Sequence, residues 1–138
     1  MINENEGDNQ YSISIQTGMW RANGTSANVG LAIYGNKGNT EDITLTDSQA
    51  EKIFFSRGSI NNFTLCLPES LGSLEKIRIW HDNSGNNPSW FLMQVVIVDF
   101  ATGDKVHFVA NRYNSLHFLY SQFHLIFIKS NGVTCTSP

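Results

Sequence analysis

The sequence predicts an all-β domain, folded as an antiparallel sandwich or a barrel. About eight short stretches alternate apolar and polar residues, and this period of two is typical of half-buried strands. Turn signals rich in glycine, asparagine and serine separate the stretches, and no segment shows the periodicity of an amphipathic helix. With 138 residues, of which 41% are hydrophobic and 15% charged, the chain fits one domain with a core.

The N-terminal half shows the alternation most clearly. In the first strand Tyr11, Ile13 and Ile15 alternate with serine and glutamine. After a loop that pivots at Gly24, the second strand repeats the pattern and ends at a Gly-Asn-Lys-Gly turn. A third strand carries two apolar residues on one face, and the short run Ile-Phe-Phe follows a polar loop. These strands are predicted at residues 11–18, 28–35, 41–47 and 53–55.

The C-terminal half of the predicted sandwich contains four more strands. Pro68 ends the first of them, because proline cannot donate a hydrogen bond within a sheet. The next two are separated by a long polar loop, and the sequence Ala-Thr-Gly-Asp-Lys forms a hairpin turn before the last. These strands are predicted at residues 62–68, 77–80, 91–100 and 106–112.

The two ends of the chain differ in character from the sandwich. Residues 1–10 are polar and acidic, which predicts a flexible leader before the domain at residues 11–112. Residues 113–138 form an atypical apolar tail without clear strand alternation, and the stretch 116–128 is too short to cross a bilayer. This tail could pack as an extra strand or a helix, or remain loose.

Composition and motifs exclude several function classes. The net charge is −3 and no Lys/Arg run occurs, which argues against a nucleic-acid groove. Cys66 and Cys135 lack metal-ligand spacing and are interpreted as free thiols. No nucleophile elbow, zinc motif or phosphate loop is present, and His81 and Asp82 are strand neighbours that point to opposite faces. We therefore expect no enzyme.

Several stretches of the chain form a recognisable set. They include YSISIQTG near the N-terminus, FFSRGSINNFTL in the middle and VVIVDFATGDKVHFVANR near the end. The most specific signature is WHDNSG at residues 80–85 followed by Pro-Ser-Trp at 88–90. Together these stretches resemble a PLAT domain, the accessory sandwich of lipases and lipoxygenases, and most of all the version in the polycystin-1 family. Family members usually continue Asn-Arg-Trp-Leu, whereas Tyr113 and Asn114 follow Arg112 here, so the resemblance ends near Arg112.

The resemblance implies two four-stranded antiparallel sheets and no catalytic centre. In polycystin-like proteins the domain occupies the first cytoplasmic loop, so it would lie at the cytoplasmic face of a membrane. There it would bind anionic lipids of the inner leaflet or other membrane or cytoplasmic proteins, with calcium helping in some members, and as an isolated domain it would be monomeric. The alternative is a protein–protein adaptor without lipid affinity. A lipase or lipoxygenase accessory domain is a third, weaker match.

The resemblance to calcium-binding PLAT domains makes three loops the candidate calcium site. Gly24 and Thr25 lie in the first loop, Asp47 lies in the third, and Asp82 and Asn83 follow Trp80. Calcium takes about six to eight oxygen ligands, which loops supply from carboxylates, amides and backbone carbonyls. The alternative is that Asp82 and Asn83 hydrogen-bond the backbone of their own loop.

Aromatic residues in the loops are the candidate lipid contacts. Trp20 could enter the headgroup region while Arg21 meets phosphate, and Trp90 and Phe91 close the long polar loop. The alternative for Trp90 is that it begins a strand and fills one end of the core.

Basic residues and one serine complete the candidates. Ser59 follows Arg57 in a predicted turn and is a candidate phosphorylation site, although a serine is also ordinary there. Five basic residues would form a patch only if the strand order brought them together: Arg57, Lys76, Arg78, Lys105 and Arg112.

Overall fold

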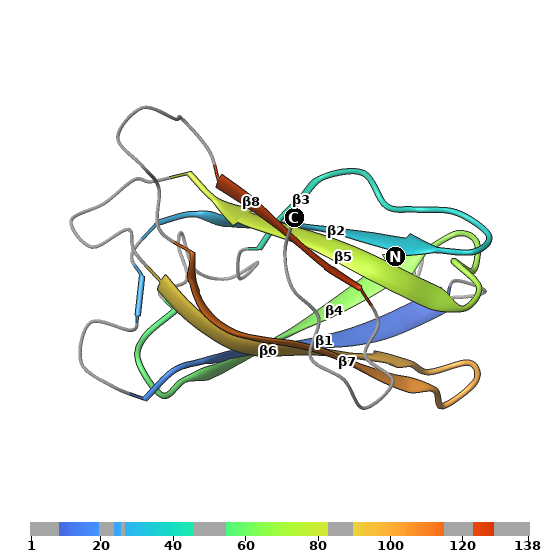
Figure 1. The fold of residues 1–138 in the computed structure, drawn as a ribbon. Coiled ribbons are helices and arrows are strands. Elements are labelled where there is room, and N and C mark those ends of the chain that lie inside the picture. The colour runs from blue at the N-terminus through green and yellow to red at the C-terminus, as the bar shows by residue number, and fades with distance from the viewer. Residues whose placement is uncertain are drawn as a thin grey trace, which may run out of the picture.

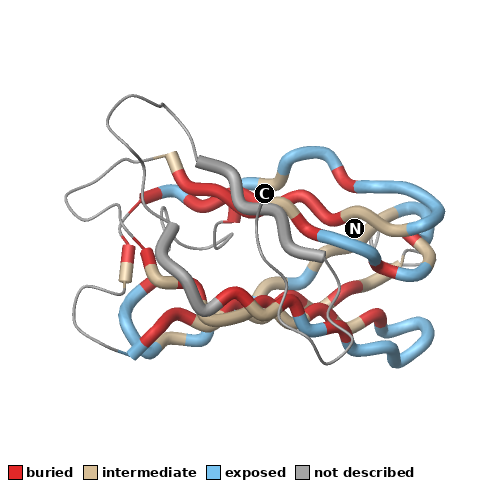
Figure 2. The backbone as a smooth tube through the Cα atoms, viewed as in Figure 1, coloured by how far each residue is buried: buried red, intermediate tan, exposed pale blue. Residues whose placement is uncertain are grey.

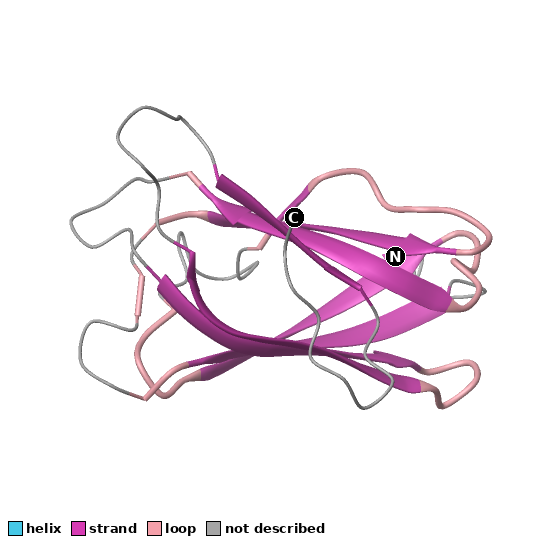
Figure 3. Ribbon diagram, in the orientation of Figure 1, coloured by secondary structure: helices cyan, strands magenta, loops and turns pink. Residues whose placement is uncertain are grey.

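Eight β-strands make up the regular structure of the described part of the chain. The computed structural model describes residues 9–19, 24–25, 27–45, 55–82, 90–114 and 123–128, and of residues 111–114 and 123–128 it describes the backbone course only. Within these ranges there is no helix, and hence no helix that could cross a bilayer (Figure 3). The strands are β1 Asn9–Thr17, β2 Val29–Gly35, β3 Ile43–Thr44, β4 Ile60–Leu67, β5 Leu74–His81, β6 Trp90–Asp99, β7 Lys105–Asn114 and β8 Phe123–Ile128.

The strands form two antiparallel sheets that face each other as layers (Figure 1). The first sheet has the order β4-β1-β6-β7, and the second has the order β3-β2-β5-β8. Every pairing within them is antiparallel. The predicted sandwich of two four-stranded sheets is therefore confirmed.

The core lies between the sheets and follows the predicted alternation. On β1, Tyr11, Ile13 and Ile15 are buried, and the residues between them are half-buried on the outer face. Ile13 lies between Phe63 of β4 and Ile97 of β6 in the register of the sheet. Figure 2 shows buried residues along both sheets. A strand with one face in the core keeps its register, because a one-residue slip would expose its apolar side chains.

The backbone of the apolar tail contributes a strand. β8 pairs antiparallel with β5, and in this register Lys76 lies opposite Ile128 and His81 lies opposite Phe123. β7 also continues to Asn114, beyond the expected end of the resemblance at Arg112. Residues 123–128 are almost all large and apolar, so they show no alternation that could distinguish a strand from a helix.

The connections divide between the two ends of the sandwich. Short turns link β2 to β3, β4 to β5 and β6 to β7 at one end, here called the turn end. The longer connections β1–β2, β3–β4 and β5–β6 leave the strands at the opposite end, here called the loop end (left in Figure 1). Trp20, Arg21, Asp47 and Asn83 fall in these longer connections and lie outside the described residues.

A candidate membrane-facing site at the loop end

Backbone hydrogen bonds join the first connection to the two others. The amide of Gly18 donates to the carbonyl of Phe91, and the carbonyl of Gly18 accepts from the amide of Gly58, at 3.0 and 2.7 Å. Thr17 donates through its amide to the carbonyl of Ser59 at 3.0 Å. The described residues that precede Trp20 are thus fixed against the flanks of both other connections.

A second contact holds the far side of the first connection. Thr25 and Phe55 form a two-bond antiparallel bridge, with N–O distances of 2.9 and 3.2 Å. Gly24 passes so close to this strand that a Cβ would lie 2.8 Å from the amide nitrogen of Arg57 and from the carbonyl oxygen of Phe55. A glycine is required here by the close approach of two backbones.

Asp82 binds Asn28 across two connections with three hydrogen bonds, a group here called the Asp82–Asn28 clamp. The amide of Asn28 donates to Oδ1 of Asp82 at 3.0 Å, and the side-chain amide of Asn28 donates to Oδ2 at 2.7 Å. The amide of Asp82 donates in return to the carbonyl of Asn28 at 3.0 Å. One alternative from the sequence is that Asp82 hydrogen-bonds its own loop, whereas these three bonds join it to a different connection.

Trp90 lies in the core and not at the surface. Its side chain is fully buried, and Nε1 donates to Oγ1 of Thr17 at 3.0 Å. Its ring packs against Phe55 with the centroids 5.3 Å apart. The structure therefore favours the alternative in which Trp90 fills one end of the core, and a ring so placed cannot enter a bilayer without unfolding this end. Phe91, the next residue, is half-buried.

Met19 is an exposed apolar residue that the sequence reasoning missed. It is 73% exposed at the loop end, beside Gly58, where a Cβ would lie 3.9 Å from its Cγ. Arg57 is exposed in the adjacent turn. The available signal was the position of Met19 next to Trp20 in a polar loop. An exposed methionine beside a cation is the combination that suits a membrane surface.

Of the five candidate calcium ligands, the structure describes three. The Thr25 hydroxyl is buried and accepts from the amide of Ala27 at 3.0 Å, which suits a local turn better than a metal. Asp82 is half-buried and directs both carboxylate oxygens at Asn28. Among the described residues no group of three or more His, Cys, Asp or Glu side chains gathers. Among the candidate ligands that the structure describes, Asp82 is the one carboxylate.

Ser59 ends a tight turn at the loop end. Its amide donates to the carbonyl of Ser56 at 3.0 Å, and Gly58 has a φ of 71°, which glycine adopts without strain. The hydroxyl of Ser59 is half-buried and donates to Oδ1 of Asn61 at 3.0 Å. A phosphate on this oxygen would break that bond and place negative charge beside Arg57.

The basic residues proposed as a patch do not gather on one surface. Arg57 lies at the loop end, Lys76 and Arg78 lie on the outer face of the second sheet, and Lys105 lies on the outer face of the first. Only the backbone of Arg112 is described. Strand order separates residues that sequence alone could not place.

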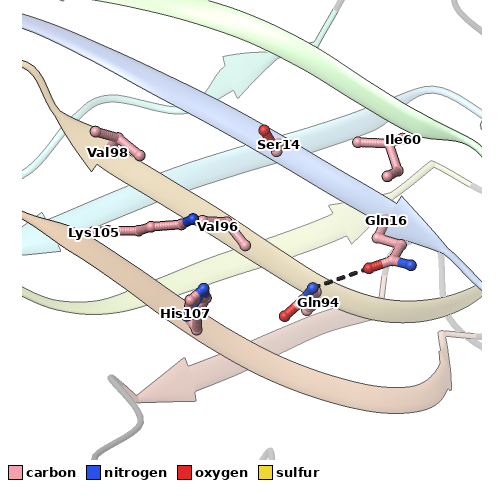
Figure 4. Close-up of a pocket in the computed structure, with 8 residues that line it drawn as sticks. All are labelled: Ser14, Gln16, Ile60, Gln94, Val96, Val98, Lys105 and His107. Atoms are coloured by element: carbon pink, nitrogen blue, oxygen red, sulfur yellow. Dashed lines mark hydrogen bonds between the residues drawn. The ribbon is translucent and has the colours of Figure 1, made fainter.

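The outer face of the first sheet is hollowed (Figure 4). The hollow has a volume of about 320 Å³. The side-chain amide of Gln94 donates to Oε1 of Gln16 at 2.9 Å within it, and Ile60 at its rim is 58% exposed. Its lining comes from all four strands: Ser14, Gln16, Ile60, Gln94, Val96, Val98, Lys105 and His107. A shallow surface of this kind suits a protein contact better than an enclosed small molecule.

Comparison with protein families and curated proteins gives consistent matches. The PLAT/LH2 domain model matches residues 11–117. The chain is 43% identical to human polycystin-1-like protein 3 over 101 residues, which is 73% of this chain and 6% of that protein. It is 38% identical to human polycystin-1 over 107 residues, which is 78% of this chain and 2% of that protein. The chain therefore spans a small fraction of these relatives.

Solved structures match the fold at lower sequence identity. The coral 8R-lipoxygenase superposes with a TM-score of 0.72 and 22% identity over 88% of this chain and 17% of that chain. In that lipoxygenase, calcium activation is attributed to a C2-like domain. At this identity the likeness concerns the fold alone.

Proposed function

Because the chain belongs to the PLAT/LH2 domain family, we propose that it is a non-catalytic regulatory module that docks to an anionic membrane leaflet through its loop end. The chain would be part of a polycystin-1-like membrane protein, and it would dock to the inner, cytoplasmic leaflet. Other membrane or cytoplasmic proteins are the expected partners beside lipid. The similarity to polycystin-1-like protein 3 and polycystin-1 supports this placement.

The exposure of Met19 at a fixed corner of the sandwich carries the proposal. The hydrogen bonds of Gly18 hold this corner in place, so little ordering is needed when a membrane contacts it. Burying a methionine side chain in an apolar phase contributes about 1.5–3 kcal/mol, and each cation near an anionic leaflet adds about 1 kcal/mol. Trp20 and Arg21 follow Met19 directly in the sequence and would add to both terms.

We also propose that calcium assists this docking. Asp82 would supply one carboxylate, Asp47 and Asn83 would add side-chain oxygens, and Gly24 would add a backbone carbonyl. The bound cation would neutralise acidic groups near the leaflet and attract lipid phosphate. The calcium activation ascribed to the C2-like domain of coral 8R-lipoxygenase supports this proposal. Because this site would contain so few carboxylates, we expect its affinity for calcium to be weak.

Sedimentation with phosphatidylserine vesicles tests the proposal on the full chain. Met19→Ser should weaken vesicle binding by roughly tenfold to a hundredfold, because a side chain worth about 1.5–3 kcal/mol no longer enters the apolar phase. Trp20→Ala and Arg57→Gln should also weaken it. Phe100→Ser is the matched control, because Phe100 is 55% exposed in the β6–β7 turn at the opposite end. High salt should weaken binding by the wild-type chain.

Two outcomes would contradict the proposal. Equal loss of vesicle binding with Met19→Ser and Phe100→Ser would mean that general hydrophobicity, and not the loop end, drives binding. No sedimentation at any phosphatidylserine content, with calcium or with a chelator, would favour the adaptor alternative. The hollow on the outer face of the first sheet would then be one surface to test for a protein partner.

A further inference from the structure

The outer face of the second sheet carries a row of cationic and aromatic side chains. Lys76, Arg78 and Trp80 are alternate residues of β5, so they share one face, and the residues between them are buried in the core. Tyr34 of β2 lies opposite Lys76 in the register. We call Tyr34, Lys76, Arg78 and Trp80 the cation–aromatic row.

Contacts within the row hold the charged groups of Lys76 and Arg78 in place. The guanidinium of Arg78 lies 4.6 Å from the ring centroid of Trp80, and Nζ of Lys76 lies 5.0 Å from the ring centroid of Tyr34. Nε of Arg78 donates to the hydroxyl of Tyr34 at 3.4 Å. Cations ordered in this way lose less side-chain freedom when they bind an anion.

Small residues on β2 make room for the row. Gly30 lies opposite Trp80, and a Cβ on Gly30 would overlap the indole ring. Ala32 lies opposite Arg78 and is fully buried. The larger side chains of β5 therefore have room to extend across β2.

Arg78 already binds a carboxylate from the same chain. Nη2 of Arg78 donates to Oδ1 of Asp42 at 2.6 Å, and the Asp42 side chain is 63% exposed. The hydrogen bond to Tyr34, together with the charge of Asp42, raises the pKa of Arg78 above its ordinary value against the effect of burial. The guanidinium thus stays charged, and its carboxylate partner is exposed enough to exchange.

We propose that the cation–aromatic row binds an extended acidic segment of a partner protein, and that Asp42 occupies the place of one of its carboxylates in the free domain. Lys76 and Arg78 are two residues apart on a strand, which is a spacing of about 6.8 Å. An extended segment with acidic residues at alternate positions presents its carboxylates at the same spacing. The planar guanidinium of Arg78 suits a carboxylate, and Lys76 adds a second charge.

A peptide fits this face better than an anionic bilayer does. Glu41 and Asp42 are exposed on the connection beside the row, and a continuous anionic surface would be repelled by both. A peptide needs only a narrow track, and one of its carboxylates replaces Asp42. Trp80 is only 9% exposed, so it stacks on Arg78 instead of projecting toward lipid.

Titration of the full chain with a synthetic peptide tests the inference. The peptide has about eight residues, with glutamate alternating with threonine, and a second peptide has glutamine in place of glutamate. Amide chemical shifts should move along β2 and β5 with the acidic peptide only. Arg78→Gln and Lys76→Gln should each weaken binding by roughly threefold to tenfold, as expected for charge-assisted hydrogen bonds at a surface. Lys105→Gln, on the outer face of the other sheet, is the matched control and should not.

Asp42→Asn provides a test that loss of folding cannot imitate. Removal of the competing carboxylate should strengthen peptide binding by roughly twofold to fivefold, the value of an exposed ion pair. Unchanged or weaker binding by this variant, or an equal effect of Lys105→Gln and Arg78→Gln, would overturn the inference. So would loss of phosphatidylserine vesicle binding by Arg78→Gln without loss of peptide binding. The loop-end proposal is tested by different residues, so either can fail alone.

Discussion

Trp90→Phe would separate the two roles considered for this residue, core packing and lipid contact. The substitution keeps a ring against Phe55 but removes the indole N–H that donates to Thr17. Because Trp90 is fully buried, the change acts inside the domain. We expect the folded state to lose stability and the loop end to keep its exposed surface.

The magnitude follows from two terms. Loss of one buried hydrogen bond costs about 1 kcal/mol. Phenylalanine buries roughly 40 Å² less than tryptophan, which costs about another 1 kcal/mol at about 25 cal/mol per Å². The free energy of unfolding should therefore fall by about 2 kcal/mol, a large part of the stability of a domain this size.

Equilibrium urea unfolding measures this loss, and a double-mutant cycle isolates the hydrogen bond. Thr17→Val removes the acceptor, and the coupling between the two substitutions should be about 0.5–1.5 kcal/mol. Vesicle sedimentation at a temperature where both proteins are folded should give the same affinity for wild type and Trp90→Phe. A variant with unchanged stability but weakened vesicle binding would refute the assignment of Trp90 to the core.

Three further predictions concern other sites. Tyr11→Phe should lower the free energy of unfolding by about 1–3 kcal/mol in urea, because its hydroxyl accepts from the buried amide of Leu71 at 3.0 Å. Gly30→Ala should cost about 1–3 kcal/mol through overlap with the indole that covers it, whereas Gly38→Ala, with open space around it, should change little. Ser59→Glu should weaken phosphatidylserine vesicle binding severalfold through charge repulsion, and Ser59→Ala should not.

The sandwich could be predicted because its signal is local. Residues such as Tyr11, Ile13 and Ile15 show by alternation alone which face of a strand is buried, and the structure places all three in the core. The resemblance to the PLAT domain, drawn from several stretches of which residues 80–90 are the most specific, is likewise confirmed by the family match. Neither inference required knowledge of strand pairing.

The pairings that build the surfaces could not be predicted, because they depend on register between distant strands. Arg78 meets Asp42 because Arg78 lies opposite Ala32 of β2, and β2 pairs with β3 directly after Asp42. The strand at 123–128 gave no alternating signal, and its place beside β5 depends on tertiary contacts. The sequence alone does not decide between the two roles of Trp90, because a large ring at a strand start is compatible with either, and its full burial in the structure decides for the core.

The Asp82–Asn28 clamp has a mechanical consequence for any ligand of the domain. Three hydrogen bonds join the segment entering β2 to the segment leaving β5, so neither can shift without the other unless the bonds break. A ligand that pulls on one segment must perturb its neighbour, and a second ligand there would bind with altered strength. If the loop end docks to a bilayer as proposed, two weak contacts made by these segments would bind cooperatively.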